Sequence, residues 1–260
     1  MGYFVLDGKA STDFGVTISG TESWPTPSRE VETAKIPGRL GSLVTYVGSW
    51  QNVDITYPAF MSRRFDLKFD AFAEWWNAHT DNYYQLTDTY HPGYYREARP
   101  ISALSPNVGT INRSGKFDLK FSCKPQKFLR DGAIKRTVEN GGQIVLTNPT
   151  MYDAYPLIVA KIRDYGAHKI GIYDELDSVV SLVTFRTSDN LYSYLDTDIR
   201  YDAEIHEATA QFPGLLVSAN SVVSEEYPNE WTIACIPAKT TVTIESWHGE
   251  FDIYPRWFTI

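Results

Sequence analysis

The chain has 260 residues and a formal net charge of −8, with 43% hydrophobic and 22% charged residues. This length is sufficient for one large or two medium domains with buried cores, without disulfides to support them. The acidic balance argues against a dedicated nucleic-acid-binding protein, which usually carries a basic domain or stripe, and no apolar run approaches the roughly 18 residues of a membrane-spanning helix.

Strand patterns dominate the first half of the chain. YFVLD opens it, LVTYV (43–47) and NVDITYP (52–58) follow a Gly-rich turn, and residues 82–101 read as two strands about a Pro-Gly turn. The clearest alternation is SGKFDLKFSCKPQKFL (114–129), which puts apolar side chains on one face and polar ones on the other. The predicted inward side chains are Phe117, Leu119, Phe121 and Cys123, and the outward ones are Asp118, Lys120 and Ser122.

One segment predicts a helix. In residues 62–79, apolar side chains recur at helical spacing and form a single stripe. The stripe consists of Phe65, Phe69, Phe72, Ala73 and Trp76. Ser62 or Asp66 is a candidate cap. FDLKF (65–69) also alternates as a strand would, but the stripe continues to Trp76 without a break, which favours the helix.

The composition becomes polar and Gly-rich at residues 130–143, RDGAIKRTVENGGQ, and we place a domain boundary there. The predicted domains are 1–133 and 134–260. The second half consists of short strands separated by Gly, Pro, Asn and Asp, which is typical of an antiparallel β-sandwich. The predicted strands are QIVLTN, PLIVAKI, HKIGIYD, SVVSLVTF, LYSYLD, IRYDAEI, WTIACIP, TTVTIESW and EFDIYPRWF.

The Gly38-Arg39-Leu40-Gly41 cluster raises the question of an anion site. A phosphate-binding loop follows a strand, precedes a helix and typically ends in Lys-Ser or Lys-Thr. Here an alternating strand follows and the Lys is missing. The cluster therefore predicts a turn, in which glycine adopts positive φ and Pro37 fixes the entry.

Acidic and histidine clusters do not match known metal motifs. Asp88, His91 and His79 have no helix or hairpin metal spacing. The Asp196-Thr197-Asp198 triplet and the acidic group at 174–177 are typical of solvated turns. We predict no metal site and no cofactor.

Nucleophile motifs are also missing from the sequence. The two cysteines, Cys123 and Cys235, have no CxxC spacing and are expected to be buried, reduced thiols. His248-Gly249 is expected to form the turn of a hairpin between TTVTIESW and EFDIYP. There is no G-x-S-x-G elbow. The sequence therefore predicts no catalytic residue and no enzyme.

Taken in order, several segments resemble one family. They are FVLDGKASTDFGVTISG, IPGRLGSL, NVDITYPAF, the helix, YQLTDTYHPGYYREAR, GKFDLKFSCKPQKFL and the closing FDIYPRWF. Their order and joint presence resemble the siphophage distal tail protein family, most specifically over residues 4–129 and 240–260.

The resemblance implies a mainly β architecture. The N-terminal domain would be a β-sandwich or split barrel with one helix and a protruding hairpin, and the C-terminal domain a galectin-like antiparallel β-sandwich. Six copies would form a ring that joins the tail tube to the adhesion device, with tail-tip, tail-associated and receptor-binding proteins as partners. Pro37–Gly41 would turn the chain at the base of a strand pair that reaches a neighbouring subunit.

Further expectations concern location and nucleic acid. The opening MGYFVLDGKA places Asp7 and Lys9 where a signal peptide needs an apolar core. We expect assembly in the host cytoplasm, a place at the virion tail tip, and no membrane partner. DNA would pass through the ring without specific binding.

A second function class stays open, namely a carbohydrate-binding module for host-surface glycans. The candidate stacking residues are Trp231, Trp247 and Trp257. Two of them lie in alternating strands, and Trp is highly buried on average, so the pattern favours core packing. The second half carries no sequence motif for galactoside recognition, and a galectin-like fold would not by itself imply sugar binding.

Overall fold

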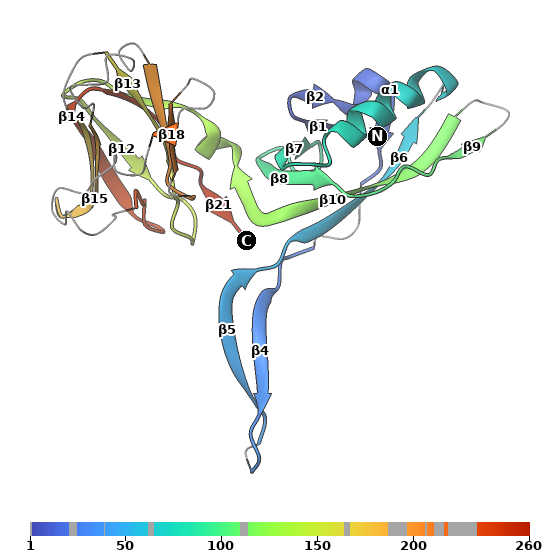
Figure 1. Cartoon of the computed structure of the whole chain (residues 1–260), viewed down its shortest axis with the longest axis horizontal. Coiled ribbons are helices and arrows are strands. Elements are labelled where there is room, and N and C mark those ends of the chain that lie inside the picture. Colours follow the sequence, from blue (N-terminus) through green and yellow to red (C-terminus); the bar gives the residue numbers. More distant parts are fainter. Residues whose placement is uncertain are drawn as a thin grey trace. The chain divides into compact units, whose positions relative to one another are not determined.

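The structure is a computed structural model of the whole chain. It describes residues 2–20, 25–38, 40–61, 65–109, 114–163, 167–186, 197–205, 207–210, 216–217 and 233–260. The chain is mainly β and divides into two compact units, Met1–Lys127 and Phe128–Thr259 (Figure 1). The division lies within a strand, a short distance before the boundary predicted between residues 133 and 134.

The first unit is built on one large antiparallel sheet. Its central strands are β6 (Val53–Met61) and β10 (Ser114–Leu129), paired from Met61 opposite Gly115 to Val53 opposite Cys123. The strand order is β2-β1-β7-β8-β10-β6-β3, and β9 also pairs with β10. Hydrogen bonds between Gly2 and Ile18 link the region of β1 to β3, so the sheet curls into a half-barrel. The remaining strands are β1 (Phe4–Leu6), β2 (Lys9–Ala10), β3 (Val16–Ile18), β7 (Tyr84–Asp88), β8 (Tyr94–Pro100) and β9 (Asn107–Gly109).

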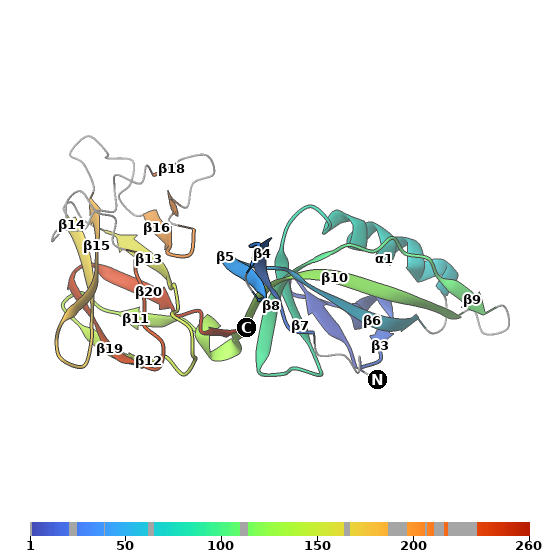
Figure 2. The ribbon, with the colours of Figure 1, turned by 90° about the horizontal axis from the view of Figure 1, so that it is seen from below.

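A single α-helix among the described residues, α1 (Phe65–Ala78), covers one face of this sheet (Figures 1 and 2). Phe65, Phe72 and Trp76 are buried, and Phe69 packs at the edge of the same core. The predicted helix is confirmed, and the strand alternative for FDLKF at 65–69 is wrong. Ser62 lies outside the described residues. The helix forms because its apolar stripe has the sheet to pack against.

The alternation predicted for residues 114–129 is confirmed from Lys116 to Phe121, but the outward position predicted for Ser122 is wrong, because Ser122 is buried between Phe121 and Cys123. Phe117, Leu119, Phe121 and Cys123 are all buried under the helix side of the sheet, while Asp118 and Lys120 are exposed. The predicted strand pair at 82–101 corresponds to β7 and β8, which pair from Tyr84–Ala98 to Leu86–Arg96. Period-two patterning of a half-buried sheet explains both results.

A hairpin formed by β4 (Arg29–Lys35) and β5 (Ser42–Trp50) makes its own two-stranded sheet. It extends away from the large sheet (Figure 1). LVTYV therefore pairs with the preceding REVETAK segment, which the sequence analysis did not identify as a strand.

The second unit consists of two antiparallel sheets that share one core. The larger has the order β11-β20-β13-β16-β17-β18 and the smaller β12-β19-β14-β15. Their strands are β11 (Arg136–Val138), β12 (Gln143–Thr147), β13 (Leu157–Ile162), β14 (Ala167–Tyr173), β15 (Val179–Arg186), β16 (Thr197–Asp202), β17 (Glu207–Ala210), β18 (Leu216–Val217), β19 (Thr241–His248) and β20 (Glu250–Tyr254). Side chains from both sheets, such as Ile158 and Ile244, meet in a single cluster, which makes this unit an antiparallel sandwich.

The Pro-Arg-Trp segment at 255–257 contacts other parts of the second unit. The Arg256 guanidinium donates to both carboxylate oxygens of Asp202, at 2.6 and 2.9 Å, and the Arg256 backbone N–H donates to the Gly132 carbonyl at 2.8 Å. Trp257 is buried in the core. The Pro-Arg-Trp segment thus holds β16 and the start of the unit together.

Two predictions about this unit are wrong. His248-Gly249 is not a hairpin turn, because β19 and β20 belong to different sheets and the chain crosses between them at Gly249, which has φ 98°. WTIACIP is not a strand over its described residues, which make only an isolated bridge from Ile236 to Ala154. LYSYLD lies outside the described residues. None of the helices in the described part of the chain is long and apolar enough to cross a membrane.

Candidate assembly surface

The β4–β5 hairpin presents apolar side chains to solvent. All seven residues of β4 are exposed, and so are residues 42–45 of β5. The exposed apolar residues are Val31, Ile36, Leu40, Leu43 and Val44. Leu40, at the end of the hairpin, is fully exposed. Exposed apolar residues that gather on one element mark a candidate interaction site in soluble proteins.

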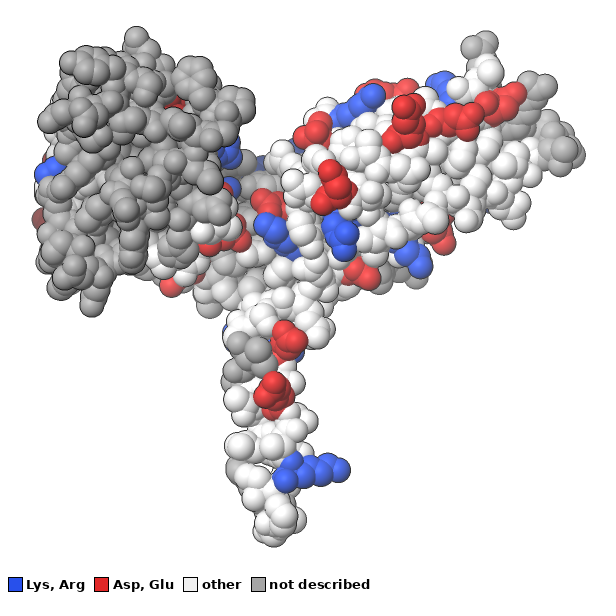
Figure 3. Space-filling model, viewed as in Figure 1, with Lys and Arg blue, Asp and Glu red and all other residues white. Residues whose placement is uncertain are grey.

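The register of the hairpin separates its two faces. Val31 lies opposite Tyr46 and Thr33 opposite Val44, so Val31, Thr33 and Val44 share one face, here called the Val31/Val44 face. Thr45 pairs with Glu32 on the opposite face. In Figure 3 most of the hairpin surface carries neither acidic nor basic side chains.

The turn at the end of the hairpin consists of Pro37–Gly41. Gly38 and Gly41 have φ of 81° and 85°, which confirms that glycine supplies positive φ there. The expectation that this turn lies at the base of the strand pair is wrong, because it joins Lys35 to Ser42 at the far end. A tip position follows from the pairing, since the two strands run back from the turn toward the large sheet. Arg39 lies outside the described residues.

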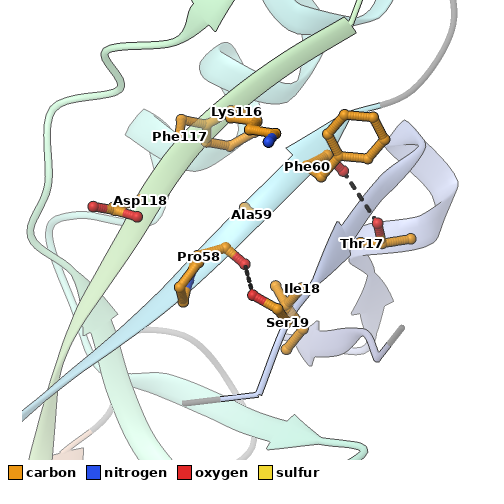
Figure 4. A pocket seen from close by; sticks show the side chains of 9 residues that line it. All are labelled: Thr17, Ile18, Ser19, Pro58, Ala59, Phe60, Lys116, Phe117 and Asp118. Carbon is orange, nitrogen blue, oxygen red and sulfur yellow. Dashed lines mark hydrogen bonds between the residues drawn. The ribbon is translucent and has the colours of Figure 1, made fainter. Parts of the chain in front are cut away.

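A groove of about 520 Å³ lies on the face of β3, β6 and β10 opposite the core (Figure 4). It is mostly apolar, with Phe60 and Pro58 on its floor and Lys116 and Asp118 at its border. The hydroxyls of Thr17 and Ser19 donate to backbone carbonyls of β6, at 3.2 Å each. The groove therefore has the chemistry of a packing surface and lacks a paired nucleophile and base.

The three residues weighed as a metal site have separate structural roles. Asp88 accepts hydrogen bonds from the Tyr57 hydroxyl at 2.8 Å and the His91 backbone N–H at 2.8 Å, and His91 Nδ1 lies 3.1 Å from the carboxylate. His79 Nδ1 instead contacts the Trp75 carbonyl at 2.7 Å. No group of three His, Cys, Asp or Glu side chains within the described ranges is arranged to hold a metal ion.

Hydrogen bonds determine the charge state of the Asp88 cluster. Burial opposes ionisation of the carboxyl, but hydrogen bonds from Tyr57 and His91 outweigh it and hold the pKa of Asp88 below its usual value. Burial, followed by the charge of Asp88, raises the pKa of Tyr57. The cluster thus consists of a fixed carboxylate and a neutral phenol, which is a stabilising arrangement for a strand end.

The other acidic candidates form turns and ion pairs. Asp174 accepts hydrogen bonds from the backbone N–H groups of Leu176 and Ser178, both at 2.8 Å, which confirms a turn there. The turn predicted for the Asp196-Thr197-Asp198 triplet is wrong at Thr197 and Asp198, which begin β16 and pair with β13. Asp198 forms an ion pair with Arg163 at 3.0 Å, and Asp196 lies outside the described residues.

The cysteines have the properties of packed thiols. Cys123 is buried and Cys235 half-buried, and neither forms a disulfide. Burial raises the pKa of the Cys123 thiol to about 12 and that of Cys235 to about 11. At neutral pH both are therefore protonated, and the thiol is a poor nucleophile compared with the thiolate.

The tryptophans behave differently from one another. Trp257 is buried, which confirms core packing for that residue. For Trp247 the core interpretation is wrong, because its side chain is 49% exposed. Trp231 lies outside the described residues.

The sequence analysis missed the hairpin residues as a surface. β4 contains four charged residues and only one large apolar residue within its seven positions, so it does not resemble a half-buried strand. The available signal was the alternation of Val31 and Thr33 before a Pro-Gly turn, followed by the apolar β5. That pattern predicts a hairpin but not which face has a partner.

No family model and no curated protein matches the chain. Solved structures do share its fold. The Dit protein of phage SPP1, described as a paradigm of the hub adsorption apparatus in phages that infect Gram-positive bacteria, is 13% identical, with a TM-score of 0.62 and 97% of each chain covered. Chains of the phage p2 baseplate in its activated conformation, with strontium and with calcium, are each 10% identical, with TM-scores of 0.57 and 0.56 and 97% of each chain covered. The resemblance to siphophage distal tail proteins is thus confirmed at the level of the fold.

Proposed function

We propose that the chain is a structural subunit at the tip of a long non-contractile phage tail, where six copies form a ring-shaped hub. The main support is the similarity to hub and baseplate proteins, which extends over 97% of both chains. The similarity therefore includes both units and not one common module. The ring joins the tail tube to the host-adhesion device.

The hairpin supports the ring within this proposal. A contact between two different surfaces of neighbouring copies closes into a ring when its rotation divides a full circle. The exposed Val31/Val44 face supplies one such surface, and an isolated two-stranded hairpin of this length needs a partner to be stable. The first domain, predicted as 1–133, therefore carries the ring contacts.

The remaining assignments complete the proposal. The C-terminal domain, predicted as 134–260, is a galectin-like sandwich, and the partners are the tail tube protein, tail-associated proteins and receptor-binding or adhesion proteins. The protein is assembled in the host cytoplasm and resides in the virion. It has no enzymatic activity, and DNA passes through the ring without specific binding.

A carbohydrate-binding module is the second candidate function. One observation favours it, namely the exposed Trp247 on the second unit, which the sequence had suggested would be buried. This function is compatible with the hub, because it uses a different unit of the chain.

The mass of the purified protein tests the hub directly. One copy has a mass of 29.5 kDa, so a ring of six has a mass of about 177 kDa. Light scattering coupled to size-exclusion chromatography, alone and with the cognate tail tube protein, is expected to detect this species. A monomer under both conditions would contradict the ring.

A matched pair of hairpin variants locates the contact. Val44→Asp places a charge on the Val31/Val44 face, and Thr45→Asp places the same charge on the opposite face of the same exposed strand. We expect Val44→Asp to abolish the ring and Thr45→Asp to retain more of it, because burying an unpaired carboxylate in an apolar contact is unfavourable. Equal behaviour of the two variants would show that this face is not the contact.

A further inference from the structure

The smaller sheet of the second unit has one face in the core and one directed outward. Ile170, Ile172 and Ile244 point into the core. Because side chains alternate along a strand, the residues between them point outward. Cross-strand pairing places Gly171 of β14 directly opposite Glu245 of β19 on that outer face.

Trp247 occupies an irregular position at the edge of this face. The pairing of β14 with β19 changes from Lys169–His248 to Ile170–Ser246, so Trp247 is the extra residue of a β-bulge. β12 ends before it, since its last pair with β19 is Gln143–Glu245. Bulges redirect side chains and are frequent beside functional sites. Here the bulge leaves an indole 49% exposed on a strand whose neighbouring inward side chains are fully buried.

A tyrosine lies beside this tryptophan because glycine leaves room for it. A Cβ atom at Gly171 would lie 2.6 Å from the Tyr173 ring, so the ring lies across the glycine. Burial and the nearby Glu245 carboxylate raise the pKa of Tyr173, and the adjacent Trp247 side chain lowers it, while the Tyr173 hydroxyl itself is buried and makes no hydrogen bond to the described residues. Tyr173, Glu245 and Trp247 are therefore neighbours, and they are called the aromatic patch below.

A turn held by hydrogen bonds borders the patch. The Ser246 backbone N–H donates to the Gly142 carbonyl at 2.9 Å, and the Gly249 N–H donates to Asn140 Oδ1 at 2.9 Å. These two bonds hold the Asn140–Gly142 turn against the stretch of β19 that carries Trp247. A Cβ at Gly141 would meet nothing within 4 Å, so this border is open.

We propose that the aromatic patch binds a neutral saccharide. An exposed indole face offers the flat apolar surface on which the C–H face of a pyranose stacks, as other ligands stack on aromatic rings. The Glu245 carboxylate beside it accepts hydrogen bonds from sugar hydroxyls, and such charge-assisted bonds are stronger than neutral ones.

Charge selects among saccharides. Glu245 is the charged member of the patch, and Lys169 lies farther along the same outer face of β14, opposite His248. A sugar stacked on Trp247 beside Tyr173 meets the Glu245 carboxylate, so a phosphate or carboxylate placed there is disfavoured by like-charge repulsion, whereas neutral hexoses and N-acetylhexosamines are not. The same chemistry is present in a free sugar and in a surface polysaccharide, so the test includes both.

The binding site and the hub are independent. The patch lies on the second unit, and the proposed ring contacts lie on the hairpin of the first. A ring that binds no sugar would refute the site alone, and a monomer that binds sugar would refute the hub alone.

Saturation-transfer NMR on the full chain provides the test. The probes are neutral hexoses and N-acetylhexosamines, neutral oligosaccharides built from them, and anionic oligosaccharides of the same length. We expect binding of neutral probes, tighter for oligosaccharides than for monosaccharides, and none of the anionic set. Absence of binding to every neutral probe, or preference for anionic ones, would overturn the proposal.

Variants connect the signal to the patch. Trp247→Ala is expected to weaken binding by about tenfold or more, Trp247→Phe by less because a ring is retained, and Gly171→Ala to weaken it by displacing Tyr173. Met151→Ala, at another strongly exposed apolar residue of the same unit, is the matched control and should change nothing. Since Trp247 is exposed, its replacement should leave the melting temperature nearly unchanged. Binding that survives both Trp247→Ala and Gly171→Ala would overturn the assignment.

Discussion

The first unit contains two long antiparallel strand pairs with opposite surroundings. In the pair β6–β10, alternate residues such as Tyr57 and Leu119 are buried beneath α1. In the pair β4–β5, every residue of β4 is exposed although the backbone pairing is as regular over Val31–Lys35. The backbone hydrogen bonds are therefore alike, and the difference lies in whether a hydrophobic face is covered.

The comparison indicates where each pair obtains its stability. Burial of apolar area is the main stabilising contribution in folding, at about 25 cal/mol per Å², and β6–β10 obtains it within the chain. An isolated two-stranded hairpin is marginal in water. The exposed apolar residues of β4–β5 are thus consistent with burial by another molecule, and the proposed ring supplies that molecule.

The largest expected effect comes from truncating Trp76, a buried side chain of α1, the helix that covers β6 and β10. Trp76 is fully buried, and its indole N–H donates to the Ser102 carbonyl at 2.9 Å. Trp76→Ala should reduce the free energy of unfolding by about 3–5 kcal/mol, as for large aromatic truncations in cores. Chemical denaturation followed by circular dichroism measures this change.

Leu67→Ala is the control for this experiment. Leu67 lies on the same helix but is 70% exposed, so its truncation should alter the free energy of unfolding by at most about 0.5 kcal/mol. Similar losses for both variants would mean that burial of the Trp76 side chain does not explain the loss, because both substitutions introduce the strong helix former alanine.

A smaller effect is expected where β7 ends beside β6. Asp88→Asn removes the carboxylate that accepts from the Tyr57 hydroxyl and should cost about 1–3 kcal/mol at pH 7, because a buried polar partner loses a charge-assisted bond. Asp118→Asn, on the exposed face of β10, should cost much less. Thermal unfolding of both variants measures the contrast.

The pH dependence of the Asp88 effect has a defined sign. The pKa of this carboxyl is lowered in the folded state, so its contribution is present above the unfolded pKa of about 3.9 and is lost as pH falls through the lower folded value. The stability difference between the unmodified chain and Asp88→Asn should therefore be constant from neutral pH down to about pH 4 and shrink below it. A difference that shrinks already between pH 7 and 5 would contradict this assignment.

The sequence predicted those elements whose apolar residues recur with the period of a helix or of a strand. The helix at 65–78 and the strand at 114–129 each carry a complete apolar stripe, and the structure contains both. β4 was missed because all seven of its residues are exposed, so its sequence carries no burial pattern. Local periodicity indicates a face that is buried within the same chain. It gives no signal for a face that is exposed in the single chain.

Connections between elements were less predictable. TTVTIESW and EFDIYP have the alternation and the intervening glycine of a hairpin, yet Gly249 leads from one sheet to the other. Strand patterns specify which face is buried but not which strand is the neighbour, and that choice depends on the packing of the whole sandwich. Trp247 was misassigned for a different reason. Counting by two from the buried Val242 and Ile244 places it with Glu245 on the outward face, but the average burial of Trp was given more weight than this alternation.

The smallest expected effect concerns the tip of the hairpin. Gly38 has φ 81°, and a Cβ there would meet nothing within 4 Å, so Gly38→Ala introduces backbone strain without a clash. Strain of this kind costs about 1–2 kcal/mol. Because the hairpin has little core of its own, the cost should appear as local opening of β4–β5 rather than as a change in unfolding of the unit.

Hydrogen exchange measured by mass spectrometry resolves this local effect. Peptides covering residues 29–50 should exchange roughly fivefold or more faster in Gly38→Ala, the factor that corresponds to about 1 kcal/mol, while peptides of β6 and β10 stay unchanged. Gly93→Ala, in the turn between β7 and β8, is the matched control, since a Cβ there also meets nothing within 4 Å and its φ is not in the left-handed region. If the hairpin is covered in the ring, the difference between the two variants should diminish on assembly, because a partner then holds the strands together. Acceleration in β6 and β10 as large as in β4 and β5 would mean that the hairpin and the sheet open as one unit, and that the two strand pairs are not energetically separate.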